Sequence, residues 1–155
     1  MTVIAEMCQN HNGDQGLLRE MVSSAIEAGA GVVKFQLIFA DMLSWRPRFD
    51  NGEIAQNGRV VSIKRPYKEE YARLKNLEIP NEVFADLASV CNASGVKPLC
   101  TAFNIDSLYK IKDMGFKAVK IASYDCASYP MLSIADNLFE EIFISTGSTF
   151  NSEIE

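Results

Sequence analysis

Two lysines stand inside apolar stretches of the sequence, where a charged side chain is costly unless it is matched. Lys34 lies in GVVKFQLI and Lys120 lies in FKAVKIAS. Gln36 follows Lys34 by two residues, so in a strand their side chains point to the same face. Two ammonium groups that converge at one mouth would bind a small anion with more than one charge. The alternatives are a solvated lysine at a strand end or an ion pair with Glu6.

Hydroxyl and carboxylate side chains stand where other apolar stretches end. Ser123 and Ser145 supply neutral donors that could hold phosphate or carboxylate oxygens, although a serine there is often only a turn residue or a cap. Thr101 stands at a comparable strand end and is a further candidate for substrate binding. Glu6 and Asp125 could transfer protons or bind sugar hydroxyls, and Asp125 could instead cap the helix that follows it.

The stretch QNHNG (9–13) follows the first apolar run and gathers donors and acceptors in a tight loop. Asn10 and His11 are its candidate substrate-binding residues, while Asn12 and Gly13 form a common turn pair. His11 could orient a substrate or ligate a metal, or be bonded to the loop backbone. One histidine is too few for a His-based metal site made by this chain alone, so we predict none.

Composition excludes several classes of function. The chain has 155 residues, which fits one domain or a piece of a larger one. Its net charge of −5 makes a broad basic face for nucleic acid or anionic lipid improbable. No apolar run reaches the roughly 18 residues of a membrane span, and the start lacks a leader pattern, so we expect a cytoplasmic protein. The cysteines, which form no CxxC pair, are interpreted as buried free thiols: Cys8, Cys91, Cys100 and Cys126.

Short apolar stretches alternate with amphipathic patterns, which predicts βα repeats and a parallel sheet covered by helices. The predicted strands are 2–7, 31–38, 96–103, 116–123 and 141–147. The predicted helices are 15–28, 67–76, 80–93, 105–114 and 128–138, with Asp14 as the first N-cap and glycines after the first and fourth. Residues 39–66 show no clear periodicity, and we interpret them as an extended loop over one face.

The polar ends of all these strands favour a closed barrel over an open sheet. An open sheet gathers ligand groups at one switch point, whereas a (β/α)8 barrel collects them from many strand ends. No glycine-rich nucleotide motif follows any strand. A barrel needs eight strands and about 250 residues. We therefore predict an α/β, TIM-barrel type fold represented by about five of its eight βα units, a partial barrel from a longer protein.

These residues, in this order, resemble the N-terminal half of the sialic acid synthase family, which includes N-acetylneuraminate synthase and the legionaminic and pseudaminic acid synthases. The resemblance rests on five motifs: IAEMCQNHNGD (4–14), EAGAGVVKFQ (27–36), CTAFNIDS (100–107), VKIASYD (119–125) and ISTG (144–147). It implies a (β/α)8 barrel that condenses phosphoenolpyruvate with an N-acetylated amino sugar, such as N-acetylmannosamine, and releases phosphate. Residues 1–155 would be the N-terminal portion of that barrel, without its later strands and its C-terminal antifreeze-like domain.

The resemblance also implies roles for individual residues. Lys34, Lys120, Ser123 and Ser145 would contact phosphoenolpyruvate, and Glu6, Gln36 and Asp125 would face the sugar or the transferring protons. Among these, Glu6, Asp125 and Lys120 would be catalytic. Two positions depart from the family pattern: Asp125 stands where the family often has glutamate, and Ala102 where it usually has proline.

A divalent metal, Mn²⁺ or Mg²⁺, is expected for the full-length family, and the full-length protein would be a homodimer. The family's metal-binding histidines lie on later strands, and its antifreeze-like domain lends an arginine to the neighbouring subunit. Because this sequence contains neither region, we expect the isolated chain to lack a complete site and to be inactive.

Two other interpretations stay open. Lys34 or Lys120 could form a Schiff base in an aldolase if burial depressed its pKa, and borohydride trapping with pyruvate would reveal the adduct. Alternatively, the chain could be a catalytically silent half-barrel that associates through its open edge. Size-exclusion measurement of the isolated chain would test that association.

Overall fold

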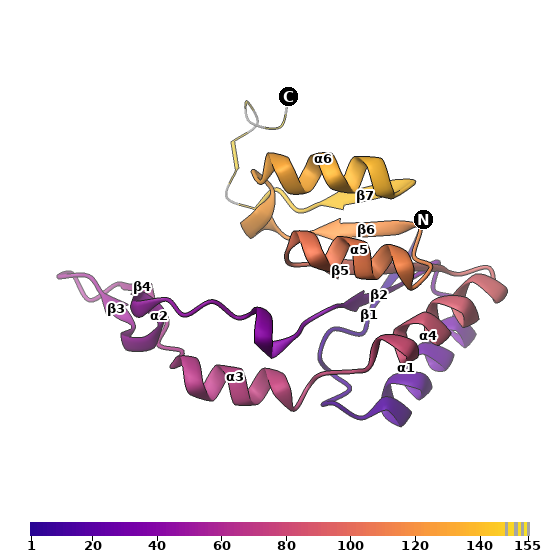
Figure 1. The fold of residues 1–155 in the computed structure, drawn as a ribbon, viewed down its shortest axis with the longest axis horizontal. Coiled ribbons are helices and arrows are strands. Elements are labelled where there is room, and N and C mark those ends of the chain that lie inside the picture. Colours follow the sequence, from indigo (N-terminus) through magenta and orange to yellow (C-terminus); the bar gives the residue numbers. More distant parts are fainter. Residues whose placement is uncertain (148, 151, 153, 155) are drawn as a thin grey trace. The chain divides into compact units, whose positions relative to one another are not determined.

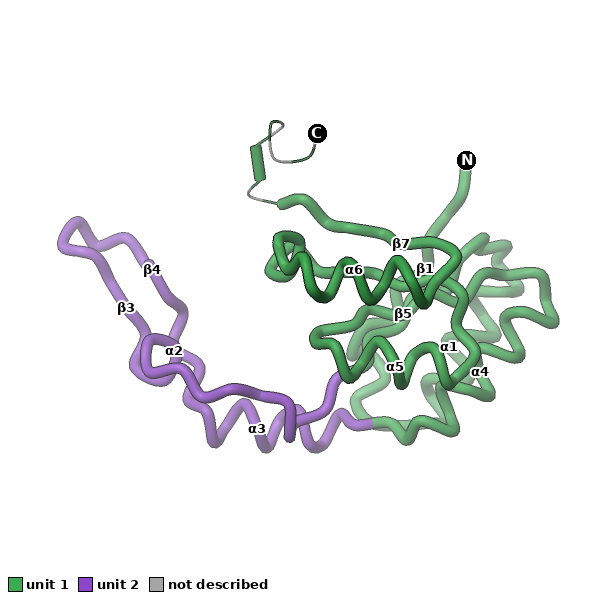
Figure 2. Tube along the Cα trace, turned by 45° about the horizontal axis from the view of Figure 1, so that its top comes forward, with its two compact units in different colours: residues 1–37, 79–155 green, residues 38–78 purple. Residues whose placement is uncertain are grey.

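The structure is a computed structural model that describes residues 1–147, 149–150, 152 and 154. It divides the chain into two compact units, which are coloured separately in Figure 2. Residues Met1–Leu37 and Ile79–Glu155 form the first, here called the sheet unit. Residues Ile38–Glu78 form the second, here called the hairpin unit.

The sheet unit is built on a five-stranded parallel sheet in the order β1-β2-β5-β6-β7 (Figure 1). Its strands are β1 (Ile4–Glu6), β2 (Val32–Gln36), β5 (Lys97–Ala102), β6 (Ala118–Ile121) and β7 (Glu141–Ile144). All five predicted strands are present, but each is shorter than predicted. Apolar residues such as Leu37 and Phe116 lie outside the strands but are buried, each only 1% exposed. The apolar stretches of the sequence therefore extend beyond the hydrogen-bonded strands.

Four helices connect these strands, within a residue or so of the predicted bounds. They are α1 (Gln15–Glu27), α4 (Asn81–Ala93), α5 (Ile105–Asp113) and α6 (Tyr129–Leu138). The Asp14 carboxylate accepts the Leu17 N–H at 3.0 Å, and the Asn104 amide oxygen accepts the Ser107 N–H at 2.7 Å. These N-caps satisfy backbone donors that the first turn leaves free. Among the described residues, none of the helices has the length and apolar character needed to cross a membrane.

The two faces of the sheet carry different residues because side chains alternate along a strand. On one face, Phe35 packs edge-to-face against Phe84 of α4 and against Phe116, with ring centroids 5.9 Å apart in both pairs. On the other face, Val32 forms a buried apolar cluster with Leu99 and Ala118, and Phe143 packs against it. Toward the carboxyl ends of the strands, this second face becomes polar.

The hairpin unit corrects the prediction of a structureless loop over residues 39–66. It contains a 3-10 turn (Ala40–Met42), α2 (Pro47–Asn51), and the antiparallel strands β3 (Glu53–Ile54) and β4 (Val60–Ser62). The predicted helix that follows is present as α3 (Tyr67–Lys75). The strands are only two and three residues long, which is too short for a periodic sequence signal.

A tight turn and one carboxylate organise this unit. Gly58 adopts a φ of 81°, which glycine tolerates well, and its N–H donates to the Ala55 carbonyl between the two strands. The Asp50 carboxylate accepts the Trp45 indole N–H at 3.0 Å and the Tyr67 backbone N–H at 2.6 Å. These bonds hold the pKa of Asp50 below its usual value. Asp50 therefore caps α3 from a distant point in the sequence.

Candidate functional site

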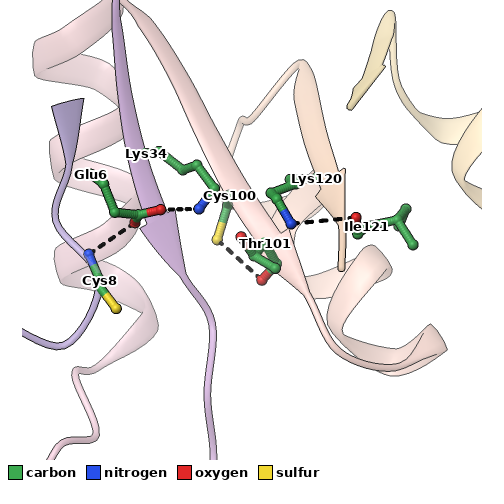
Figure 3. A network of polar contacts seen from close by, with 7 residues as sticks. All are labelled: Glu6, Cys8, Lys34, Cys100, Thr101, Lys120 and Ile121. Carbon is green, nitrogen blue, oxygen red and sulfur yellow. Dashed lines mark hydrogen bonds and ion pairs between the residues drawn. The ribbon is translucent and has the colours of Figure 1, made fainter. Parts of the chain in front are cut away.

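The strand register places the predicted lysines on one face of the sheet. Glu6 is opposite Lys34, Gln36 is opposite Thr101, and Thr101 is opposite Lys120. Paired residues in a parallel ladder point to the same side of the sheet, and so do Lys34 and Gln36, which are two apart on β2. All five side chains therefore lie on the face that carries the Val32 cluster, at the carboxyl ends of the strands. Figure 3 shows Thr101 on the strand between the two lysines.

Glu6 and Lys34 form an ion pair at this end of the sheet (Figure 3). The Lys34 side chain is 11% exposed, whereas that of Glu6 is 39% exposed. The second carboxylate oxygen of Glu6 accepts the Cys8 backbone N–H at 3.0 Å. The ion pair that the sequence left as an alternative is therefore present, and the charge of Lys34 is matched before any ligand binds.

Replacing Glu6 by glutamine should lower the free energy of unfolding by about 2 kcal/mol, because the buried Lys34 ammonium loses its counter-charge. Urea denaturation followed by circular dichroism measures this change. The matched control is Glu141→Gln, since the Lys97–Glu141 pair is 45% and 43% exposed and a pair of that kind contributes about 0–1 kcal/mol. Equal losses in the two variants would contradict the account of Lys34.

Lys120 differs from Lys34 because, among the described residues, it forms no ion pair. Its Nζ donates to the Ile121 carbonyl at 3.4 Å. Burial lowers the pKa of Lys120, the nearby Lys34 charge lowers it further, and Glu6 opposes both effects. A half-buried ammonium without a carboxylate partner attracts an anion more strongly than one that is already neutralised.

Thr101 carries the clearest sign of a missing partner. The residue is 2% exposed, and its Oγ1 has no hydrogen-bond partner among the described residues. Its backbone carbonyl is occupied, because it accepts the Leu37 N–H at 3.2 Å. Buried hydroxyl groups in proteins are nearly always hydrogen-bonded, so a buried hydroxyl without a partner between two lysine-bearing strands points to a ligand.

Two of the predicted hydroxyl residues lie at the same ends of the strands. Ser123 begins the 3-10 turn Ser123–Asp125, which one residue separates from the end of β6, and Ser145 follows β7. The Ser145 N–H donates to the Ile121 carbonyl at 3.1 Å. A Cβ added at Gly147 would meet the Ser123 Cβ at 3.5 Å, so the segment after β7 lies against Ser123.

Asp125 is half-buried at the end of that 3-10 turn. Its interpretation as the cap of the next helix was wrong, because the N-cap of α6 is Ser128. The Asp125 backbone carbonyl accepts the Ser128 N–H at 2.9 Å. The chain therefore makes one further turn before α6 begins.

The loop after β1 turns His11 inward. His11 is 4% exposed, and its Nδ1 accepts the Gly13 N–H at 3.0 Å. Burial lowers the pKa of His11, which a hydrogen bond with the Cys8 backbone partly offsets. Asn10 is exposed, and its backbone N–H donates to the Met7 carbonyl at 3.1 Å. The third possibility considered for His11, a bond to the loop backbone, is therefore present.

The structure corrects the prediction for two of the four cysteines. All four thiols are free, but only Cys91 and Cys100 are buried, so the expectation of four buried thiols was wrong for Cys8 and Cys126, which are half-buried. Burial raises the pKa of the Cys91 thiol to about 11, so it stays protonated near neutral pH. Cys8 also has a positive φ of 49°, which the residue types around it did not predict.

The described part of the chain contains no group of three or more His, Cys, Asp or Glu residues that could hold a metal ion. The residues at this site therefore do not fit a divalent metal by themselves.

The fold and the site together define an α/β protein that collects polar side chains at the carboxyl ends of parallel strands. The NeuB family model matches residues 21–155, and the chain belongs to the NeuB family. It is 33% identical over 145 residues to N,N'-diacetyllegionaminic acid synthase of Legionella pneumophila, covering 94% of this chain and 39% of that protein. It is 27% identical over 155 residues to N-acetylneuraminate-9-phosphate synthase of Drosophila melanogaster, covering 99% of this chain and 39% of that protein.

A solved structure has the same arrangement of strands and helices. The crystal structure of N-acetylneuraminic acid (sialic acid) synthetase from Leptospira borgpetersenii, in complex with citrate, matches with a TM-score of 0.74 and 27% identity. The match covers 98% of this chain and 46% of that chain. The chain thus spans about two-fifths of the length of the curated relatives given above.

Proposed function

We propose that this chain carries the phosphoenolpyruvate-binding part of a sialic acid-type synthase. The full reaction condenses phosphoenolpyruvate with an N-acetylated amino sugar to give a nonulosonate and phosphate. Family membership and the names of the relatives support synthesis of an acidic sugar. The main support for anion binding is the Thr101 hydroxyl, which has no partner among the described residues and lies between the strands that bear Lys34 and Lys120.

Phosphoenolpyruvate carries a phosphate and a carboxylate on a three-carbon frame, so it needs positive charge and hydrogen-bond donors at one place. In this proposal Lys120 pairs with one of its anionic groups, and the Thr101 hydroxyl donates to an oxygen of the same ligand. Ser123 and Ser145 add donors from the ends of β6 and β7. Lys34 contributes a charge that Glu6 already holds in place.

In the reaction, C3 of phosphoenolpyruvate attacks the aldehyde carbon of the open-chain sugar, and water adds at C2. The tetrahedral intermediate then loses phosphate. Fixed ammonium groups stabilise the negative charge that gathers on the leaving phosphate, and they do so without reorganising during the step. We assign proton transfer or sugar contacts to Glu6 and Gln36, which end β1 and β2, and to Asp125, which ends the 3-10 turn after β6.

The proposal extends to the architecture and the assembly. We propose that the five-stranded sheet is part of a (β/α)8 barrel, because its strands are parallel and in sequence order, and because a related synthase has the same fold over 98% of this chain. We also propose that the full-length protein is a homodimer that uses a divalent metal, whose site the described residues of this chain do not complete by themselves.

The other interpretations have less support. The lowered pKa of Lys120 is what a Schiff-base lysine would need, but family membership does not favour an aldolase. A catalytically silent half-barrel is likewise not favoured by the relatives, which are named as synthases.

Replacing Thr101 by valine tests the observation on which the proposal rests. Valine keeps the shape and removes the hydroxyl, so the affinity for phosphoenolpyruvate should fall about tenfold, as expected for one lost hydrogen bond to a charged group. Isothermal titration calorimetry measures the dissociation constant. Thr101→Ser keeps the donor and should lose less affinity than valine. Unchanged binding in the valine variant would refute the role of Thr101.

A further inference from the structure

The turn after β1 contains a residue in an unusual backbone conformation. Cys8 has a φ of 49°, in the left-handed region that is unfavourable for residues with a Cβ other than asparagine and aspartate. It lies two residues after Glu6, the last residue of β1. In this conformation the Cys8 N–H donates to the Glu6 carboxylate at 3.0 Å. The strained residue and the charged residue of the site are thus directly bonded.

The surrounding loop holds Cys8 in place. The Met7 N–H donates to the Lys34 carbonyl at 2.9 Å, which continues the β1–β2 ladder up to the turn. The buried His11 ring is hydrogen-bonded to the Cys8 backbone and also accepts the Gly13 N–H. Left-handed residues of this kind persist when neighbouring structure fixes them, and they often occur at functional sites.

A continuous set of contacts runs from this turn to the anion site. The Cys8 N–H binds one oxygen of the Glu6 carboxylate, and the other oxygen pairs with the Lys34 ammonium (Figure 3). The Lys34 side chain is 11% exposed and is close enough to Lys120 to repel its charge. A carboxylate held at both oxygens has few orientations, so the Lys34 ammonium has few positions.

We propose that Cys8 is a positioning residue whose left-handed backbone, rather than its thiol, orients Glu6 and thereby fixes the Lys34 ammonium at the anion site. This inference rests on the proposed function for its effect on phosphoenolpyruvate. In this proposal Cys8 contacts no substrate, and its thiol is dispensable.

Substitutions at Cys8 separate the backbone from the thiol. Glycine and asparagine tolerate the left-handed region, whereas the β-branched side chain of valine opposes it, and all three remove the thiol. We expect Cys8→Gly and Cys8→Asn to bind phosphoenolpyruvate within about twofold of the wild-type chain, and Cys8→Val to bind about tenfold more weakly. Equal affinities in the glycine and valine variants would overturn the proposal.

A second readout needs no ligand. The ¹⁵N NMR signal of the Lys34 ammonium reports its ion pair, and Glu6→Gln supplies the reference for a Lys34 whose pair is broken. Cys8→Val should move that signal toward the reference, and Cys8→Gly should leave it in place. If the wild-type chain fails to bind phosphoenolpyruvate, the proposed function is wrong. The Lys34 NMR signal still shows in that case whether Cys8 positions Glu6.

The folding of each variant is checked by its amide spectrum. If Cys8→Val does not fold, Cys8→Ala takes its place, because alanine also disfavours a positive φ but introduces no branched side chain. A folded alanine or valine variant with the wild-type Lys34 signal would show that the turn does not position Glu6. Recovery of the signal in Cys8→Asn would show that the conformation, not the thiol, is responsible.

Discussion

Replacing Lys120 by methionine is expected to weaken the binding of phosphoenolpyruvate about 100-fold, the largest effect of any single change at the anion site. Lys120 has no ion-pair partner among the described residues, so its charge is available to the ligand. Methionine has a similar length and fills the same space without the charge. Calorimetric titration of both chains measures the ratio of dissociation constants.

Lys117→Met is the matched control for this prediction. Lys117 lies just before β6 and pairs with Glu140 at 3.2 Å, with both side chains more than two-thirds exposed. Removing such a surface charge should change affinity little. Burial lowers the pKa of Lys120, so its ammonium loses its proton at a lower pH than an ordinary lysine does. As the pH rises, the affinity for phosphoenolpyruvate should therefore begin to fall at a lower pH than it would with an ordinary lysine. An equal loss in the two methionine variants would contradict a local role for Lys120.

Replacing Phe35 by alanine should lower the free energy of unfolding by about 3–5 kcal/mol, the range for a fully buried aromatic residue. Phe35 is 1% exposed at the centre of β2, and its ring contacts both Phe84 and Phe116. Removing it leaves a cavity between the sheet and α4 that these rigid rings cannot fill. Urea denaturation measures the loss.

The control for the Phe35 variant is the same substitution at Phe103, which is 40% exposed and follows β5. It should cost about 1 kcal/mol or less, because little apolar surface is returned to water. A small loss in Phe35→Ala would mean that the helix-covered face of the sheet is not the main core of the sheet unit.

The helices of the sheet unit could be predicted closely because local chemistry marks their ends. Asp14 lies at the start of α1 and accepts the bond expected of an N-cap, and Gly29 follows the helix with a φ of 81°. The strands were predicted in the right places but too long. Burial of Leu37 and Phe116 depends on tertiary packing, so no local pattern separates them from strand residues.

The hairpin unit could not be foreseen from periodicity. Its two strands are too short to show alternation, and the bonds that organise it join residues far apart, as between Asp50 and Tyr67. The Asn57–Gly58 pair was a usable turn signal. Read together with the valines at 60 and 61, it would have indicated a hairpin.

The candidate site was predictable in its composition and only partly in its contacts. Alternation along β2 was enough to place Lys34 and Gln36 on the same face, whereas Lys120 joins that face through the register of β2, β5 and β6. Which carboxylate pairs with which lysine depends on the β1–β2 register, and the sequence left that open. The missing partner of Thr101 and the left-handed Cys8 are properties of three-dimensional packing that residue types do not encode.

Titration of the ¹⁵N-labelled wild-type chain with phosphoenolpyruvate, followed by NMR, tests the central claim most directly. The account predicts that signals of Lys34, Thr101 and Lys120 shift together and fit one dissociation constant. Signals that do not move at saturating ligand, or that move with separate affinities, would show that these side chains do not form one anion site.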